Sequence, residues 1–356
     1  MATPRITVTL AGGNNTGKTV FMHGMYHRLS AGLRDYFLYS VDRDEEIRLL
    51  RTWKMLQDKG EMPRATGTEP QTYTFQFAKN FTPLLQMVWT DFRGGAALED
   101  SGPNAPKDIL QWREHLPRSD SVYLVMDGGE LGKWVKEGTP ESANFDSGGM
   151  DLATYNWVIR EAVDGRRRLG DPPPSFVVLI TKMDLLAVTA DRPIDQVLTS
   201  VVANLKKLLR QLFQNGVTAL VCPVQIGDFK TDDMFGRPVD RSLIRPQNLH
   251  RPICFSLWHY LTETLTARQA QLAEIEKKIT EGDAELSELR AKSFQSIRRK
   301  KIAAARSAQW GWETERTGME AEITATESQA ELLMREFDRL PIIKDGDIHI
   351  SSGGSS

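Results

Sequence analysis

Hydrophobic and polar residues change their spacing several times along the chain, and each spacing predicts a type of secondary structure. In the first two thirds, short apolar runs rich in β-branched and aromatic residues alternate with stretches of helical periodicity. Strands that alternate with helices are typical of a mostly parallel sheet covered by helices on both faces. The expected strands are residues 5–11, 72–77, 84–90, 121–126, 176–181 and 217–224.

Three connections between these runs carry further expectations. The runs at 72–77 and 84–90 are joined by a short segment, so we expect one antiparallel edge strand there. Residues 194–213 have helical spacing and are followed by Asn215 and Gly216, which predicts one helix with its end. Residues 127–174 are more than a crossover helix needs, so this insert should include a loop over a site or a partner surface.

After about residue 262 the pattern becomes that of long helices, because Gly and Pro grow rare and apolar residues recur at spacings of three and four. Two such arms flank residues 293–316, which predicts an antiparallel α-helical coiled-coil hairpin; one long helix that dimerises is the alternative. The chain thus divides into a domain at 1–262, an arm at 263–340 and a flexible tail at 341–356. The apolar positions of the arm are Leu265, Leu272, Ile275, Ile279, Leu286, Leu289, Met319, Ile323, Ala330, Leu333, Phe337 and Leu340.

The densest chemical signal is GGNNTGKT at residues 12–19, which fits the pattern G-x-x-x-x-G-K-[ST] between an expected strand and an expected helix. Gly12 and Gly17 let the backbone curl so that its N–H groups and the helix N-terminus face a phosphate. Lys18 is expected to bind the β- and γ-phosphates, and the Thr19 hydroxyl to bind Mg²⁺. The expected nucleotide-binding residues here are Gly12, Asn14, Asn15, Thr16, Gly17, Lys18, Thr19 and Val20.

A second signal, VWTDFRGG at residues 88–95, is an apolar strand followed by D-x-x-G. Asp91 would hold Mg²⁺ through water, and the Gly94 N–H would meet a γ-phosphate oxygen. Arg93 lies in the same loop, where it could act as an arginine finger in cis or across a dimer; a solvated loop arginine is the alternative.

A third signal selects the base. Residues 176–186, FVVLITKMDLL, are a strand followed by Thr181, Lys182 and Asp184. The Asp184 carboxylate can accept hydrogen bonds from the N1–H and the 2-amino group of guanine, whereas adenine would leave it unpaired. An unpaired buried polar group costs about 1–3 kcal/mol or more, which favours guanine. The Lys182 stem is expected to lie along the purine face.

Together these three motifs resemble the P-loop GTPases of the Ras-like and translation-factor class, over residues 1 to about 262. The resemblance implies a Ras-like α/β fold that binds GTP or GDP with Mg²⁺. It also implies that backbone N–H groups at Gln225 or Ile226 contact the guanine oxygen. Thr66, with Thr68 as the alternative, would close over the γ-phosphate and Mg²⁺.

Shorter stretches, GKTVFMHGMYHRL, GEMPRAT and TKMDLL, resemble the double-GTPase family proposed to act in bacterial conflict and immunity-like systems. This narrower resemblance implies GTP-driven signalling or assembly beside other encoded components.

The sequence departs from the class at two positions. Gly95 follows D-x-x-G where many GTPases have a glutamine that orients the attacking water, and Thr181 replaces the usual asparagine. We therefore expect slow or partner-activated GTP hydrolysis by a nucleotide switch. The alternatives are a GTP-gated scaffold with negligible turnover, whose helical arm does the work, and an ATPase.

Charge and composition narrow the partners. The net charge of −2 gives no overall attraction to nucleic acid or membranes, so such contacts would need a local patch. Residues 290–312 form such a patch at the arm tip, with seven basic residues from Arg290 to Arg306 among aromatic residues. It suits an acidic protein partner, anionic lipid or nucleic acid, but a solvated helix face explains it too. The helical arm is expected to bind a protein partner or to associate with itself. The three arginines at residues 166–168 could also meet an acidic partner, but an exposed helix end is the favoured explanation.

A cytoplasmic location is expected. Cys222 and Cys254 lie in apolar surroundings with no zinc-site spacing, which indicates buried free thiols in a reducing compartment. The N-terminal residues lack the pattern of a secretory signal, and no apolar run approaches membrane-spanning length.

Overall fold

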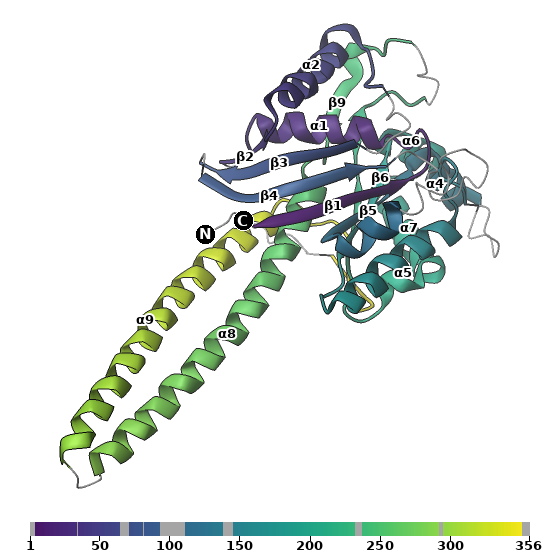
Figure 1. The fold of residues 1–356 in the computed structure, drawn as a ribbon. Coiled ribbons are helices and arrows are strands. Elements are labelled where there is room, and N and C mark those ends of the chain that lie inside the picture. Colours follow the sequence, from purple (N-terminus) through teal and green to yellow (C-terminus); the bar gives the residue numbers. More distant parts are fainter. Residues whose placement is uncertain are drawn as a thin grey trace. The chain divides into compact units, whose positions relative to one another are not determined.

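The computed structural model describes residues 4–33, 35–64, 71–80, 82–92, 111–137, 145–231, 237–291 and 295–350. The chain forms two compact units (Figure 1). Unit 1 comprises Met1–Ser256 and Phe337–Ser356, and unit 2 is Leu257–Glu336. The last residues expected in the arm, from Phe337 onward, thus belong to unit 1.

Unit 1 is built on a sheet that, within the described residues, has nine strands in the order β11-β10-β7-β6-β5-β1-β4-β3-β2. The pairs between β4, β1, β5, β6 and β7 are parallel, whereas β2, β3, β10 and β11 pair antiparallel with their neighbours. This mostly parallel arrangement is the expected Ras-like α/β fold. The strands are β1 (Arg5–Gly12), β2 (Tyr36–Ser40), β3 (Gln71–Lys79), β4 (Thr82–Asp91), β5 (Ser121–Asp127), β6 (Ser175–Thr181), β7 (Thr218–Pro223), β10 (Ile342–Lys344) and β11 (Asp347–His349).

Helices cover both faces of this sheet (Figure 1). In β5, Val122, Leu124 and Met126 join the core under one helical layer, while Tyr123 between them contacts Phe21 on the opposite face. This period-two alternation with both faces buried explains why the central strands are apolar throughout. The first layer is α4 (Gly128–Glu137), α5 (Leu152–Leu169), α6 (Met183–Ala190) and α7 (Ile194–Leu208), and the second includes α1 (Lys18–Ser30) with α2 (Arg43–Lys59) packed on it.

Two elements differ from the expectations within the sheet and its helices. The edge strand is β2, which pairs with β3, so β3 is antiparallel but interior. The helix expected over 194–213 ends at Leu208, and a 3₁₀ turn, η2 (Arg210–Phe213), follows. The Leu208 carbonyl accepts a hydrogen bond from the Asn156 side chain at 3.0 Å, and Leu209 leaves helical geometry to bury its side chain completely.

The expected flexible tail is wrong for residues 342–349. They form the β10–β11 hairpin, in which Ile343 pairs with Ala219 of β7 and is fully buried. A short second sheet pairs β8 (Gln225–Gly227) with β9 (Ile244–Gln247). These elements extend unit 1 beyond the strands that the apolar runs predicted.

Unit 2 contains most of α8 (Arg251–Ala291) and α9 (Gln295–Met334), which pack as an antiparallel hairpin, as predicted. Arg268 of α8 donates to Thr326 of α9 at 3.1 Å and pairs with Glu322 at 3.3 Å. Nearer the turn, Gln309 of α9 donates a hydrogen bond to Asp283 of α8. From the first pair to this one the residue number rises along α8 and falls along α9, as in an antiparallel hairpin. Leu257, at the start of this unit, is fully buried and was not predicted. The other buried apolar residues of the unit are predicted stripe positions: Ile275, Leu286, Ile323, Ala330 and Leu333.

Candidate functional site

The glycine-rich loop joins the end of β1 to the start of α1, as its sequence predicts. Gly17 has a φ of 81° and Asn15 a φ of 57°, so the chain curls through the left-handed region before the helix begins. The Thr16 side chain closes the turn by donating to the Gly13 carbonyl at 3.0 Å. The backbone N–H groups of this turn and of the helix N-terminus form an anion-binding geometry.

Lys18 lies within this turn and is 6% exposed. Its ammonium donates to the carbonyls of Gly12 at 2.9 Å and Gly13 at 2.6 Å. Burial lowers the pKa of Lys18 to about 8, and the nearby Asp91 carboxylate offsets part of that effect. A buried ammonium whose pKa is lowered by burial would be stabilised by an anion in the loop.

Asp91 lies next to the loop because β4 pairs with β1, with Asp91 opposite Leu10. Its carboxylate is fully buried and accepts a hydrogen bond from the Thr19 hydroxyl at 3.2 Å. A carboxylate and a hydroxyl are oxygen donors that suit Mg²⁺. In the described ranges no three His, Cys, Asp or Glu side chains gather into a metal-binding group.

The TKMD stretch lies at the end of β6, beside the glycine-rich loop. The Thr181 hydroxyl donates to the Thr16 carbonyl at 2.6 Å and lies 3.2 Å from the Met126 carbonyl. Lys182 has a left-handed φ of 49°, which starts the turn into α6. The Thr181 hydroxyl thus ties the two motifs together, although this position lacks an asparagine amide.

One cavity of about 750 Å³ joins the glycine-rich loop and the TKMD stretch. Its lining includes residues 14–21, residues 61–64, Thr181, Lys182 and Asp184, and residues 224–227, so Gln225 and Ile226 belong to the same cavity as Lys18. Asp184 accepts a hydrogen bond from the Lys230 backbone N–H at 2.9 Å. The cavity therefore has a phosphate-type end at the glycine-rich loop and a second end with a carboxylate.

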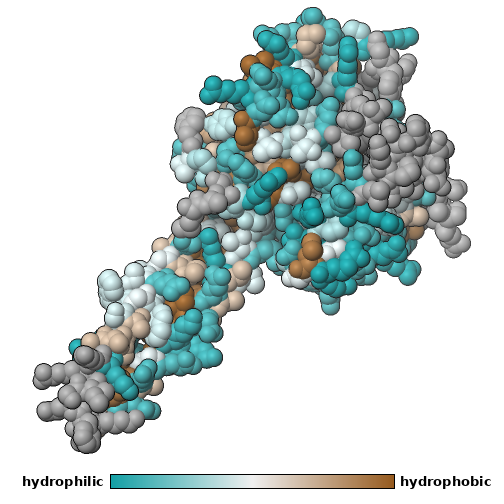
Figure 2. Space-filling view, viewed as in Figure 1, coloured by the Kyte–Doolittle hydropathy of each residue, from teal (hydrophilic) through white to brown (hydrophobic). Residues whose placement is uncertain are grey.

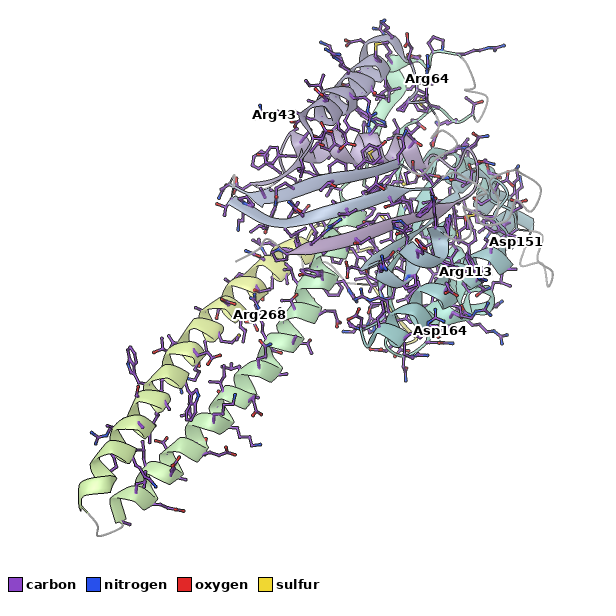
Figure 3. All side chains as sticks on the ribbon, in the orientation of Figure 1. Arg43, Arg64, Arg113, Asp151, Asp164 and Arg268 are labelled. Carbon is purple, nitrogen blue, oxygen red and sulfur yellow. The ribbon has the colours of Figure 1, made fainter. Side chains whose placement is uncertain are left out.

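Several residues that line the cavity lie outside the three sequence motifs. Arg64, labelled in Figure 3, lies on the segment after α2 and lines the cavity. Met62 and Phe229, together with the expected Ile226, pack with Trp53 and line the same cavity as Asp184. These residues come from segments far apart in the chain, so only the fold brings them together.

Sequence reasoning also missed Asp127. Its carboxylate forms an ion pair with Lys182 at 2.6 Å and accepts from the backbone N–H groups of Gly129 and Glu130 at the start of α4. Asp127 is the last residue of β5, whose neighbour β6 ends at Thr181. A carboxylate at the end of a parallel strand was the available signal. The interaction orients Lys182 at the cavity wall.

Four expected site residues, Thr66, Thr68, Arg93 and Gly94, lie outside the described residues. Their roles stay predictions. Among the described residues, no helix has the length and hydropathy needed to cross a membrane.

No protein-family model and no curated protein matches this chain. Among solved structures, a sup35 complex with GDP is 16% identical with a TM-score of 0.28 and covers 68% of this chain and 41% of its own. An Aquifex aeolicus Era variant bound to GDP·AlF4⁻ is 14% identical with a TM-score of 0.33, covering 74% of this chain and 68% of its own. The conserved domain of a dynein light intermediate chain is 10% identical with a TM-score of 0.32. The match covers 72% of this chain and 91% of the dynein chain.

This chain spans less than half the length of the sup35 chain. The TM-scores are too low to support an argument about function. The Ras-like assignment therefore rests on the strand order, the parallel pairing and the loop between β1 and α1.

Proposed function

We propose that this protein binds GTP and GDP and slowly hydrolyses GTP to GDP and phosphate. The observation that carries the proposal is the single cavity that Lys18 and Asp184 both line. One end offers amide donors and a buried ammonium for phosphates, and the other offers a carboxylate and apolar surface for guanine.

Each residue has a chemical role in this proposal. Lys18 and the backbone N–H groups of the loop would stabilise the charge that develops on the β- and γ-phosphates. Asp184 would accept the two guanine donors, and Asp127 would hold Lys182 in place along the ring. Thr19 and Asp91 would hold Mg²⁺, which neutralises phosphate charge when bound.

Single-turnover hydrolysis separates this proposal from a scaffold with negligible turnover. Purified protein is mixed with a substoichiometric amount of GTP and excess Mg²⁺, and phosphate release is followed at several protein concentrations. We expect slow release that Lys18→Ala abolishes, because the variant loses the charge beside the phosphates. Binding without release at any concentration would leave only the scaffold.

Competition with ATP tests the base. Adenine lacks the N1–H and 2-amino donors that Asp184 would accept from guanine, so ATP should displace a fluorescent GDP analogue at least about a hundredfold less effectively than GTP. Equal displacement by ATP would favour the ATPase alternative.

We further propose that the nucleotide controls partner engagement or assembly through the helical arm, in a bacterial defence or conflict system and in the cytoplasm. The helical hairpin supplies a candidate binding element, and the sequence resemblance supports the setting. The buried thiols of Cys222 and Cys254, which are not joined in a disulfide, fit a reducing compartment. Identical arm binding with GTP, with GDP and in Lys18→Ala would contradict nucleotide control.

A further inference from the structure

One face of α2 carries large apolar side chains that are exposed. The opposite face is packed on α1, where Trp53 stacks on His27 with ring centroids 5.1 Å apart. On the outer face, Ile47 is 46% exposed and Leu50 is 41% exposed. Ile47 and Met55 line a groove of about 470 Å³ along the helix. Neighbouring apolar side chains on an exposed helix face indicate a surface that binds a partner.

The charges on this face are basic. Between Ile47 and Lys54 every charged residue is an arginine or a lysine, and the exposed aspartates of α2 lie in its first and last turns. Arg48 pairs with Glu45 at 3.6 Å, whereas Arg51 and Lys54 form no ion pair with any residue that the structure describes. Such a face favours a partner that brings apolar contact together with acidic side chains. We call this surface the α2 face; it comprises Ile47, Arg48, Leu50, Arg51, Lys54 and Met55.

The outer side of α9 is uncharged over a long stretch. Opposite its buried stripe, residues 303–328 hold only Ala, Gly, Ser and Thr, apart from Trp310, which is 71% exposed. The equivalent side of α8 carries charged residues, among them Glu274, Lys277 and Glu281. A helix side that faces water is normally polar or charged, so the outer side of α9 has the character of a second packing surface. We call these outward positions of residues 303–328 the α9 face.

The α9 face allows another helix to approach closely. A Cβ added to Gly311 or Gly318 would have nothing within 4 Å, although glycine weakens the interior of a helix. Packing inside the arm therefore does not require glycine at these two positions. The hydroxyls of Thr314, Thr317 and Thr324 donate to backbone carbonyls one turn earlier at 2.8–3.0 Å. Their hydrogen bonds would be kept if the face were covered.

Glutamates line both edges of the α9 face. Glu313, Glu320 and Glu327 follow one edge, and Glu315 and Glu322 follow the other. Glu320 and Glu322 pair with arginines of the arm. The other three have no ionic partner among the described residues. An uncharged surface with acidic edges is complementary to the apolar and basic α2 face.

We propose that the α2 face of one copy of this chain binds the α9 face of a second copy. Ile47 and Leu50 lie on the small residues around Gly311 and Gly318, Trp310 enters the groove along α2, and the basic residues of α2 pair with the edge glutamates. This contact gives the assembly role proposed above for the arm its partner, and it rests on that role. Each chain has both faces, so copies join head to tail. A helix pair is a small interface, so the dissociation constant is expected to be roughly micromolar.

The α2 face is connected to the nucleotide cavity. α2 ends at Lys59, and residues 61–64 directly after it line the cavity. Met62 packs against the apolar cluster that includes Trp53 of α2. A nucleotide that displaces these residues would move α2, so self-association is expected to differ between GDP and a GTP analogue.

Exchanging the charges of the two faces tests the contact. Sedimentation velocity follows the full chain from about 1 to 200 µM. Arg51→Glu with Lys54→Glu reverses the α2 face, and Glu313→Lys with Glu315→Lys reverses the α9 face. Each double variant alone should raise the dissociation constant of self-association at least about tenfold, because like charges then meet. An equimolar mixture of the two should associate again, because every basic face then finds an acidic one on the other variant.

A steric substitution tests the same contact without a change of charge. Gly318→Leu places a side chain in open space on the α9 face, so it should leave the arm folded while it blocks the approach of α2. We expect a loss of self-association of at least about tenfold. Ala284→Leu on the outer side of α8 is the matched control, as is Glu274→Lys with Glu281→Lys for the charge variants. Both controls should stay within about twofold.

Each outcome decides the inference. Wild-type protein that stays monomeric over the whole range, with GDP, with a GTP analogue and without nucleotide, would overturn this interface, even if calorimetry shows that GDP binds. Variants that associate like the wild type, or a mixture that does not associate, would also overturn it. So would a monomeric chain that binds phosphatidylglycerol vesicles through Arg51 and Lys54, since the α2 face would then serve lipid. Self-association that both reversals abolish but that nucleotide leaves unchanged would support the interface and contradict nucleotide control.

Discussion

Lys18 is the residue that links this site to pH. Burial lowers its pKa to about 8 in the free protein, and a phosphate beside it would favour the charged form and raise that pKa again. Nucleotide binding should therefore take up a proton where free Lys18 is partly neutral. Affinity should be greatest below pH 8 and should fall as the pH rises through about 8.

Calorimetry of GDP binding in two buffers of different ionisation enthalpy measures this uptake. We expect a fraction of a proton taken up near pH 8 and almost none near pH 6.5, because Lys18 is charged at the lower pH in both states. The Lys18→Ala variant, which binds more weakly, serves as the control and should show no uptake near pH 8. Uptake that persists in the variant would assign it to another group.

Asp184 makes a prediction about the base. Asp184→Asn keeps the shape but replaces a carboxylate oxygen with an amide that donates, so it should pair with the 2-oxo group of xanthine better than with the 2-amino group of guanine. We expect GTP affinity to fall by about a hundredfold and XTP affinity to rise. Competition binding measures both, and an unchanged preference for GTP would show that Asp184 does not contact the base.

Motif residues could be placed from the sequence because each lies at a fixed position relative to a strand, as with Gly12 at the end of β1 and Asp91 at the end of β4. Asp127 and Gly148 could not. Asp127 acts through a partner on the next strand, and the contact of Gly148 with Asn14 depends on the path of a long insert. No local spacing encodes either contact.

At the scale of elements, the length of a helix or strand decided whether its sequence pattern could predict it. The long apolar stripes of α8 and α9 predict the hairpin because many residues repeat the same spacing. The strands β2, β10 and β11 have five, three and three residues, too few to show alternation. A turn signal was present for the last two, since Asp345-Gly346 separates them with φ of 51° and 86°.

One buried and one exposed isoleucine test the β10–β11 hairpin. Ile343→Ala should destabilise unit 1 by about 2–5 kcal/mol, because the side chain is fully buried against the sheet core. Ile348→Ala on β11, where the side chain is 39% exposed, should have an effect below about 1 kcal/mol. Denaturant unfolding of the full chain measures both, and equal effects would contradict the docking of β10 on β7.

Glycines in the arm give opposite predictions on its two helices. Gly318 in α9 has nothing within 4 Å of an added Cβ, so Gly318→Ala should stabilise the arm by about 0.5–1 kcal/mol. An added Cβ at Gly282 in α8 would lie 2.8 Å from the Trp312 ring, so Gly282→Ala should give no gain or a loss. Hydrogen exchange of arm amides in the full chain distinguishes the two, and stabilisation by both would contradict the packing of Trp312 on Gly282.

At the scale of the whole molecule, the chain combines a candidate nucleotide site in unit 1 with a helical hairpin in unit 2. The face seen in Figure 2 is mostly hydrophilic, with hydrophobic residues in small separate spots. Phe255 at the start of α8 packs edge-on against Phe337 just beyond α9, with ring centroids 5.5 Å apart. The two helices of the arm therefore begin and end at neighbouring points of unit 1.

A switch and a scaffold differ at this junction. If the nucleotide controls the arm, hydrogen exchange of the α8 and α9 amides should differ between protein saturated with GDP and protein saturated with a non-hydrolysable GTP analogue. The Lys18→Ala variant should show no such difference. Identical exchange in all states would favour a scaffold in which the arm acts independently of the nucleotide.

Every nucleotide-dependent role proposed for this chain requires guanine nucleotide to bind in the cavity between Lys18 and Asp184. Isothermal titration calorimetry of the folded full chain with GDP, GTP and ATP in the presence of Mg²⁺ tests it most directly. We expect one site per chain for GDP and GTP, and binding of ATP weaker by about a hundredfold or more. No heat of binding with GDP or GTP, or equal binding of ATP, would contradict it.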